Sequence, residues 1–523
     1  MNITKKRYEN FATGLCWAML LFYVCVFFLL NFSITPQFYC TDMYEDIIVS
    51  MEMWKEKTLF PSNWVFGNQI YTIATPVWSA LFYGLTGNAF FSMAAASSIM
   101  AVLVLISFDW MLRAVFPRLC DRLLGAVFLI TAMGIFGDTT LTVNGWQLLF
   151  TMCTFYSCYA ITSFLAFGCY LREGNVSGFT VVLTGLLCFF SGIQSLRQTA
   201  ITIIPLLAME FFSFLRRVYK KDRLLTKNLG MTVLFTAANL LGVVTGKMIP
   251  LAQQHIYGDI TLVSPLQYAG NFYDNLNFVA SLVSIGRVKE TVWGMIIFCG
   301  YAVLGIACVI HYRKDKSVKL LYLLILSVGA VFGIGVVTTM AMRQIYYFMI
   351  YPLAACFVTL LFSKSHIRVR GVLLGAVAAA FILCCADRVA SAAVQVRDKD
   401  KDVSYRIYED LKENDITTMY SVWNYCEKIA VAGNGEIAAG FWDVGNKPFD
   451  PKPYLHKTDT YSAPPETTAY IFCSQEEVTA AIEEAARAGT EMTLLLEYPE
   501  ENIYIYKAPI NLMEYYASIS SDE

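Results

Sequence analysis

The sequence predicts an all-α membrane protein with about eleven transmembrane helices, followed by a small α/β domain at the carboxyl end. Hydrophobic residues make up 57% and charged residues 15% of the 523 residues, and the mean hydropathy is +0.51. Apolar runs of about 20 residues, the length that crosses a bilayer, recur up to residue 390, whereas residues 391–523 are polar. The net charge of −2 gives no indication of nucleic acid as a partner.

Eleven apolar runs are predicted to span the membrane: 12–32, 89–112, 123–138, 144–170, 177–194, 199–215, 229–249, 291–311, 319–340, 345–362 and 371–390. Short cytoplasmic loops are enriched in Lys and Arg, so the basic residues orient these spans. With the amino terminus inside, twenty Lys and Arg up to residue 390 lie in inner segments and eight in the longer outer segments. We therefore expect the amino terminus inside and the carboxyl terminus outside.

This orientation places two long loops, 33–88 and 250–290, and the carboxyl-terminal part on the outer side. We expect two domains, a transmembrane domain over 1–390 and an extracytoplasmic α/β domain over 391–523. In the second domain, helices are predicted at 405–414 and 475–489, and strands at 416–423, 436–442, 469–473 and 502–508. Cys426 and Cys473 lie there, and the sequence allows either a disulfide or two free thiols.

The first outer loop begins with TDMYEDIIVSMEMW, which has the period of an amphipathic helix lying along the membrane surface. Asp42, Glu45 and Asp46 take its polar face. Asp42 has two interpretations. An Asp followed three residues later by Glu is typical of a helix cap, and a carboxylate fixed at the membrane surface is also suited to act as a general base.

The rest of this loop is aromatic and apolar but interrupted by Gly67, Pro76, Gly84 and Gly87. Such a segment is a poor transmembrane span, so we expect helices at the membrane surface. Pro76 and Trp78 lie in its centre, in the sequence TPVW.

These motifs together resemble the start of the C-type (GT-C fold) glycosyltransferases, in particular the protein O-mannosyltransferase and lipid A aminoarabinose transferase group. Asp42 matches the catalytic Asp of that family, and Glu52 with Met53 matches the following helical turn. The segment around Pro76 and Trp78 matches the family's proline and aromatic segment. Met43 and a single proline are departures from the family pattern.

The resemblance implies an inverting glycosyltransferase that uses a polyprenyl-phosphate-linked sugar and acts on the outer face of a bacterial cytoplasmic membrane. Asp42 would be the catalytic base, and Pro76 and Trp78 substrate contacts on the surface helices. Asp138, in MGIFGDTTLTVNGW, would be a second acidic site residue, with a loop or helix-capping role as the alternative. The acceptor would be a glycan, lipid or protein of the cell envelope. Glu45 and Asp46 are further acidic candidates, with the wet side of the helix as the alternative.

Two arginines interrupt apolar stretches near the outer side, Arg197 in SGIQSLRQTAI and Arg343 in TTMAMRQIYYF. A guanidinium at this position can hold a lipid-linked phosphate bidentately, and it can also anchor a helix at the interface. Polar neighbours favour Arg197 as the phosphate ligand. In the second outer loop, four side chains could contact sugar or simply face water: His255, Asp259, Tyr273 and Asp274.

The cysteines have no metal-ligand spacing, and we expect Cys384 and Cys385 to serve helix packing. No metal site and no cofactor is predicted with certainty, and a divalent metal stays open. Two other classes remain. A transporter, flippase or polysaccharide-handling protein would place its unusual residues at mid-membrane, whereas here they gather at the outer ends of the spans. A catalytically silent scaffold that displays the carboxyl-terminal domain is the other alternative.

Overall fold

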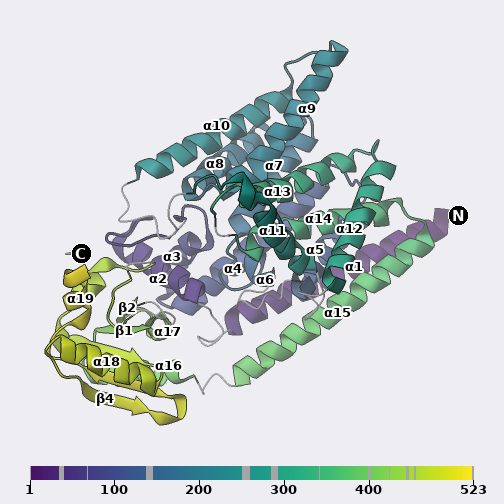
Figure 1. Cartoon of the computed structure of the whole chain (residues 1–523). Coiled ribbons are helices and arrows are strands. Elements are labelled where there is room, and N and C mark those ends of the chain that lie inside the picture. The colour runs from purple at the N-terminus through teal and green to yellow at the C-terminus, as the bar shows by residue number, and fades with distance from the viewer. Residues whose placement is uncertain are drawn as a thin grey trace.

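The computed structural model of the 523-residue chain is predominantly helical, with one small sheet near the carboxyl end (Figure 1). Structure is described for residues 2–33, 41–67, 69–136, 145–249, 260–283, 292–340, 342–397, 402–422, 425–442, 447–452 and 455–520.

Each of the eleven predicted spans overlaps a helix of the bundle. These are α1 (Asn2–Ser33), α4 (Ala89–Leu112), α5 (Leu119–Phe136), α7 (Ser157–Leu171), α8 (Gly178–Gln194), α9 (Ile204–Lys220), α10 (Lys227–Met248), α12 (Val292–His311), α13 (Ser317–Val337), α14 (Ile350–Lys364) and α15 (Ile367–Arg397). Among the described residues, seven helices are long and apolar enough to cross a membrane, and three shorter apolar helices accompany them.

The prediction of one continuous span over 144–170 is wrong. The structure has a short helix α6 (Gly145–Leu149), then turns, and α7 begins only at Ser157. Met152 and Thr154 adopt φ angles of 55° and 43°, which no helix accommodates. The backbone N–H of Met152 donates to Asn31 on α1 at 2.7 Å, so side chains of other elements replace the missing helical hydrogen bonds.

Helices α8 and α10 show how the bundle packs. A side chain added at Gly242 would meet the carbonyl oxygen of Phe189 at 2.0 Å, and one added at Gly246 would meet that of Ile193 at 2.7 Å. Two glycines four residues apart let helix backbones approach closely in a membrane. The increasing numbers on both helices show that α8 and α10 run parallel.

Two helices of the long loop between α1 and α4, α2 (Thr41–Glu56) and α3 (Thr75–Thr86), pack against each other beside α4. Pro76 lies in the first turn of α3, where a missing N–H costs nothing. Gly87 ends α3 in the left-handed region, with φ of 64°, and donates to the carbonyl of Tyr83 at 2.8 Å. Gly84 faces Trp54 of α2 so closely that a β-carbon there would lie 2.2 Å from the indole ring.

The carboxyl-terminal part contains a five-stranded sheet of order β2-β1-β3-β5-β4. Its strands are β1 (Thr418–Val422), β2 (Ala438–Trp442), β3 (Thr468–Phe472), β4 (Thr493–Tyr498) and β5 (Ile503–Lys507). The first three are parallel, whereas β5 pairs antiparallel with β3 and β4. The predicted α/β character of this part is therefore confirmed, and the edge strand β4 is an element that the sequence reading missed.

Four helices accompany the sheet: α16 (Val403–Glu413), α17 (Cys426–Ala432), α18 (Gln475–Arg487) and α19 (Leu512–Ser520). Two separate cores result. Ile407 of α16 and Ile429 of α17 pack with Phe441, while Val478 of α18 and Leu512 of α19 pack in a second core with Trp442. The sheet is thus covered on both faces, as its alternating inward residues require.

This sheet domain is attached to the loop between α2 and α3 by backbone pairing. Residues 63–65 run antiparallel to 455–458, with a bridge between Trp64 and Lys457. The N–H of Val65 donates to His456 O, and that of Leu455 donates to Val65 O, both at 2.9 Å. The Lys457 ammonium also pairs with two carboxylates of α2, those of Glu52 at 3.2 Å and Glu56 at 2.8 Å. Helix α2 is therefore held between the sheet domain and the bundle (Figure 1).

Candidate functional site

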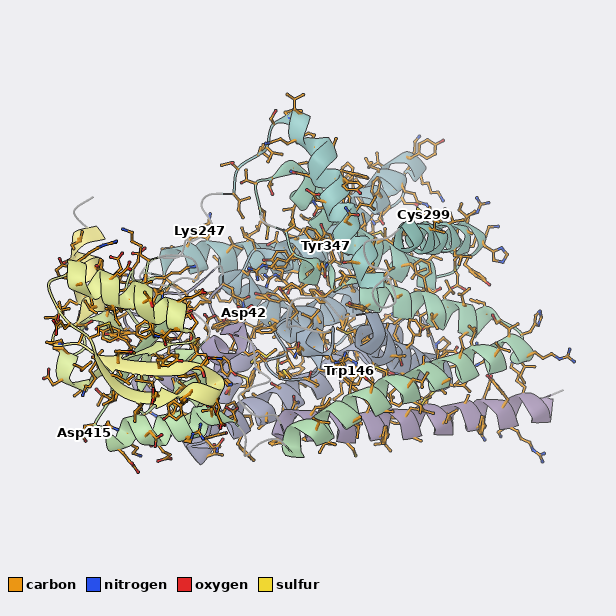
Figure 2. The ribbon with its side chains drawn as sticks, turned by 60° about the horizontal axis from the view of Figure 1, so that its bottom comes forward. Asp42, Trp146, Lys247, Cys299, Tyr347 and Asp415 are labelled. Carbon is orange, nitrogen blue, oxygen red and sulfur yellow. The ribbon has the colours of Figure 1, made fainter. Side chains whose placement is uncertain are left out.

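Asp42 lies in the first turn of α2, at the junction of the helical bundle and the sheet domain (Figure 2). The following Met43, Tyr44 and Ile47 are buried, which fixes the helix, and the Asp42 side chain is half-buried. Burial raises the pKa of the Asp42 carboxyl above its usual value, and the positive charge of Arg343 opposes this rise. Asp42 is thus a carboxylate with increased basicity beside a cation.

Arg197 lies just after the end of α8 and is surrounded by tyrosines. Its guanidinium carbon is 4.5 Å from the ring centroid of Tyr156, 5.3 Å from that of Tyr159 and 5.1 Å from that of Tyr346. One guanidinium N–H donates to Gln69 Oε1 at 3.2 Å. Such cation–π contacts hold the planar group in one orientation without neutralising its charge.

Arg343 and Tyr346 belong to one short segment, with Arg343 immediately before the 3-10 helix η5 (Gln344–Tyr347). Arg343 is exposed and its charge acts on Asp42, while Tyr346 contacts Arg197. Tyr156 lies within the electrostatic influence of both Arg197 and Asp42. The structure therefore brings Asp42, Arg197 and Arg343, which are far apart in the sequence, to one place.

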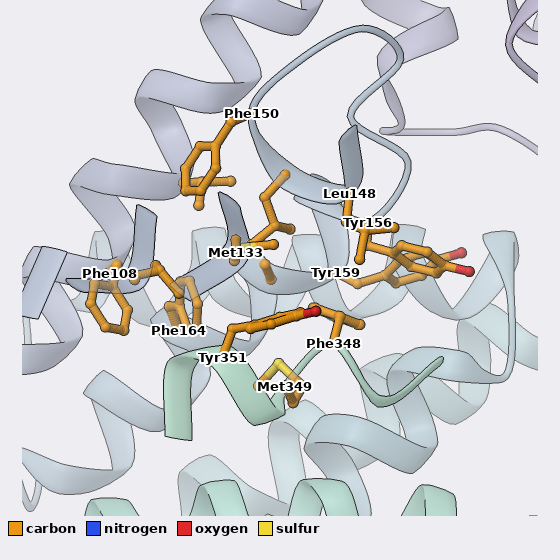
Figure 3. Close-up of a cluster of buried hydrophobic side chains, with 14 of the residues drawn as sticks. Phe108, Met133, Leu148, Phe150, Tyr156, Tyr159, Phe164, Phe348, Met349 and Tyr351 are labelled. Atoms are coloured by element: carbon orange, nitrogen blue, oxygen red, sulfur yellow. The ribbon is translucent and has the colours of Figure 1, made fainter. Parts of the chain in front are cut away.

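Aromatic side chains pack beside the segments that carry Arg197 and Arg343. Tyr156 stacks on Phe348, the residue after η5, with ring centroids 5.1 Å apart. Figure 3 shows Tyr156 and Tyr159 beside Phe348, over the buried cluster that contains Met349 and Tyr351. The two segments that carry Arg197 and Arg343 are thus tied to the same core.

A π-helical turn, η2 (Thr199–Ile203), follows Arg197 and leads into α9. Side chains of two other helices hold this turn. Ser327 of α13 donates to the carbonyl of Ile201, and the hydroxyl of Thr199 donates to Asn239 of α10 at 2.7 Å. The turn that follows Arg197 is therefore fixed by α10 and α13.

Asp46 lies one turn after Asp42 and is buried. The hydroxyl of Tyr71 donates to Asp46 Oδ1 at 2.6 Å. The pKa of Asp46 is raised to about 8. Burial is the main cause, the hydrogen bond from Tyr71 opposes the rise, and the charge of Asp42 adds to it. Glu45 is buried as well, close enough for its charge to act on Tyr71. Both residues thus lie inside the protein and not on the wet side of a surface helix, so that alternative interpretation is wrong.

The segment 69–73, between α2 and α3, supplies residues that the sequence reading missed. Gln69 accepts hydrogen bonds from Arg197 and, at 3.2 Å, from the hydroxyl of Tyr159. Gln194 at the end of α8 holds the segment by accepting from the backbone N–H groups of Thr72 and Ile73 at 3.3 and 3.4 Å. The available signal was weak, because Tyr71, Tyr156 and Tyr159 lie in apolar, aromatic stretches that read as core.

Other predicted site residues lie elsewhere. Pro76 is buried in α3, and Trp78 is 41% exposed, with its indole N–H donating to Ile73 O at 3.3 Å. They neighbour the segment 69–73 without joining the contacts around Arg197. Tyr273 and Asp274 are exposed on α11 (Tyr268–Val283). Asp138, His255 and Asp259 lie outside the described residues.

Cysteines and metal ligands add little to this site. Cys426 and Cys473 are free thiols in the structure. Cys384 packs against α5, where a β-carbon on Gly134 would lie 2.1 Å from its sulfur. Within the described ranges, no group of three or more His, Cys, Asp or Glu side chains could hold a metal ion.

A cavity of about 450 Å³ lies between α2 and the sheet domain. On the α2 side it is lined by Ile48, Met51 and Lys55, and on the domain side by residues that include Lys457 and Asp459. At 100° per residue, the three α2 residues face away from Asp42 and Asp46. Helix α2 therefore has the candidate site on one face and a cavity with mixed apolar and charged lining on the other.

The arrangement of the whole chain matches solved structures. Comparison with ArnT from Cupriavidus metallidurans bound to undecaprenyl phosphate gives a TM-score of 0.58 at 10% sequence identity, and covers 95% of this chain and 98% of that chain. The same protein in the apo state gives a TM-score of 0.57 at 10% identity, with 96% and 99% covered. This chain has the GT-C fold.

The GT-C fold expected from the first outer loop is thereby confirmed, with its apolar membrane helices and its small carboxyl-terminal sheet. At this level of identity the likeness concerns the fold. No protein-family model matches the chain, and a search of curated protein sequences gives no match. The roles of individual residues in this GT-C chain therefore depend on the geometry described above.

Proposed function

We propose that the chain is an inverting glycosyltransferase that takes a sugar from a polyprenyl phosphate and adds it to a cell-envelope acceptor. The convergence of Asp42, Arg197 and Arg343 carries this proposal. The charge of Arg343 acts on the Asp42 carboxyl, and Asp42 and Arg197 both act on Tyr156. The GT-C fold supports it, since ArnT with the same fold was solved with undecaprenyl phosphate bound.

In the proposed reaction, Asp42 accepts the proton of an acceptor hydroxyl or amine. The acceptor oxygen or nitrogen attacks the anomeric carbon of the donor, and the bond from this carbon to the phosphate oxygen breaks. The polyprenyl phosphate leaves with the electron pair. Arg197 and Arg343 stabilise the phosphate as its charge develops, which is the largest contribution that such a site can make. Attack opposite to the leaving group inverts the configuration.

Asp46 and Glu45 are proposed as acidic neighbours that adjust the basicity of Asp42. Asp138 stays proposed as a second acidic residue of the site, and Pro76 and Trp78 as substrate contacts on α3.

The proposed topology has eleven spans, with the amino terminus inside and the site and carboxyl terminus outside. In the proposed division, residues 1–390 form the glycosyltransferase domain and 391–523 the extracytoplasmic domain. The latter would cover the site or select the acceptor. The pairing of Lys457 in this domain with Glu52 and Glu56 of α2, the helix that carries Asp42, supports a role near the site.

The test of the enzyme class is the release of polyprenyl phosphate. Purified protein in lipid is supplied with polyprenyl-phosphate-linked pentoses and hexoses and a cell-envelope extract as acceptor. We expect release with one of these donors, and a loss of about 10²- to 10⁴-fold in Asp42→Asn, because Asn caps the helix but cannot accept the proton. Asp222→Asn, in an exposed loop, is the matched control.

Two results would contradict the proposal at different levels. Parental activity in Asp42→Asn would exclude Asp42 as the base while leaving the enzyme class intact. Absence of polyprenyl phosphate release from every lipid-linked sugar would exclude the class, and transport of a lipid-linked glycan would then be the function to test.

A further inference from the structure

A second cavity lies at the end of the bundle opposite to Arg197. It has a volume of about 300 Å³, near the lower limit of ligand pockets, and lies where α8 and α10 both begin. Apolar side chains of Val176, Val181, Met231 and Leu234 line it, and Lys227 is its one charged residue. The span from Thr199 to Lys220 that separates the two ends has 22 residues, or about 33 Å of helix.

The backbone around Lys227 fixes the position of its side chain. Gly174 adopts a φ angle of 87°, and a β-carbon there would lie 2.3 Å from Cδ of Lys227. The absence of a side chain at Gly174 therefore lets the aliphatic stem of Lys227 lie on the loop at the cavity. The hydroxyl of Thr226 caps α10 by accepting from the N–H of Leu229 at 3.2 Å, which fixes the turn that carries Lys227.

Further positive charge lies in the segment just before Lys227. The connection from α9 to α10 carries Lys220, Lys221 and Arg223, all exposed, and Asp222 is the one acidic residue between positions 216 and 227. Among the described ion pairs, none uses these three side chains or Lys227. Tyr219 and Leu225, at 89% and 74% exposure, place apolar groups between the charges.

The cavity opens onto a surface suited to lipid. Leu234, which lines it, is 44% exposed, and its neighbour Val233 is 56% exposed. On α8, Val182 is 59% exposed and Phe179 is 77% exposed. The cavity is continuous with an apolar helix surface, which suits an acyl chain. Lysine and arginine lie at its end, which suits the phosphate of an anionic headgroup.

We propose that this cavity binds an anionic phospholipid of the leaflet opposite to the candidate active site. The headgroup phosphate lies at Lys227, with Lys220, Lys221 and Arg223 adding attraction, and one acyl chain lies against Val181, Met231 and Leu234. This site is independent of the proposed glycosyl transfer, because it holds a structural lipid at the other end of the bundle.

Native mass spectrometry of the full-length protein tests the site. Protein purified in detergent is incubated with phosphatidylglycerol or with phosphatidylcholine of the same acyl chains, and the retained lipid is counted. We expect one phosphatidylglycerol to be retained preferentially. Lys227→Ser should lower this retention roughly fivefold or more, as expected for one charge near a phosphate. Met231→Trp should remove it by filling the cavity.

Lys314→Ser is the matched control, because Lys314 is an exposed lysine in the loop after α12 at the same end of the bundle. It should bind lipid as the parent does. Equal retention of the two lipids by the parent, or unchanged retention in both Lys227→Ser and Met231→Trp, would overturn the proposal. Displacement of phosphatidylglycerol by inorganic phosphate alone would also overturn it, since it would show a site for small anions. Monodisperse elution and an unchanged melting temperature exclude misfolding of the variants.

Discussion

The hydroxyl of Tyr71 and the carboxyl of Asp46 are joined by a hydrogen bond of 2.6 Å, one helical turn beyond Asp42. Because the pKa of Asp46 is raised to about 8, this carboxyl is mostly protonated at neutral pH. Asp42 thus has a neutral acid as its neighbour. The site carries one carboxylate charge fewer than its sequence suggests, which favours a negatively charged lipid phosphate.

The first prediction concerns the pH dependence of sugar transfer. Below about pH 8 Asp46 is protonated, and above it a second negative charge develops beside Asp42 and repels the donor phosphate. We expect the transfer rate to fall above about pH 8, and this fall to be absent in Asp46→Asn. In Tyr71→Phe it should move to higher pH, because the lost hydrogen bond lowered the pKa of Asp46. Initial rates of sugar transfer are measured from neutral to alkaline pH. If both variants showed the same dependence of rate on pH as the parent, Asp46 would not have this role.

A second prediction concerns stability. The pKa of Asp46 is about 8 in the folded protein and about 3.9 in an unfolded chain, so the folded state binds the proton more tightly. Its contribution to stability is complete below the unfolded pKa and is lost as the pH rises toward 8. The melting temperature of the parent should therefore decrease over this range more than that of Asp46→Asn, which differential scanning fluorimetry can measure. If the melting temperatures of the parent and of Asp46→Asn changed in parallel with pH, the pKa of Asp46 would not be raised in the folded protein.

A third prediction separates charge from geometry at Arg197. Replacement by Ala removes both, and we expect a loss of about 10²-fold or more in kcat. Arg197→Lys keeps the charge but loses the planar group that stacks among three tyrosines and reaches Gln69, so it should recover only part of the rate. Steady-state kinetics give kcat for both variants. Arg216→Lys is the matched control, because Arg216 is an exposed arginine at the other end of α9. Full activity in Arg197→Lys would show that charge alone suffices.

The fourth prediction concerns the contact of α2 with α3. Gly84→Ala puts a methyl group into the indole ring of Trp54, so we expect a loss of about 1 to 3 kcal/mol in the free energy of unfolding, with lower activity because α2 carries Asp42. Gly185→Ala is the control, since its added methyl group meets nothing within 4 Å. Thermal unfolding compares them. Equal stability of the two variants would show that α3 does not brace α2.

The sequence predicted the elements that depend on local patterns. The apolar runs identified the membrane helices because a bilayer demands a minimum length, and the period of TDMYEDIIVSMEMW identified α2. The break before Ser157 was invisible, because Thr151 and Thr154 are tolerated in an apolar run and their turn is stabilised by Asn31 on another helix.

The sequence predicted the charged residues of the candidate site and not its uncharged residues. Asp42, Arg197 and Arg343 attract attention because charge is costly at a membrane, whereas Tyr156 and Gln69 have no such signal. Their importance comes from distance in space: Gln69 reaches Arg197 across 128 residues of sequence. The burial of Asp46 was likewise hidden, since an acidic residue on an amphipathic helix ordinarily faces water.

The pairing of residues 63–65 with 455–458 has a consequence for how such proteins can diversify. The carboxyl-terminal domain is joined to residues 63–65 by main-chain hydrogen bonds. It is joined to α2, the helix that carries Asp42, by Lys457 between Glu52 and Glu56. A chimaera that exchanges only the carboxyl-terminal domain would lose these contacts. Exchange of the domain together with the loop between α1 and α4 would preserve them, so two segments near opposite ends of the chain must be exchanged together.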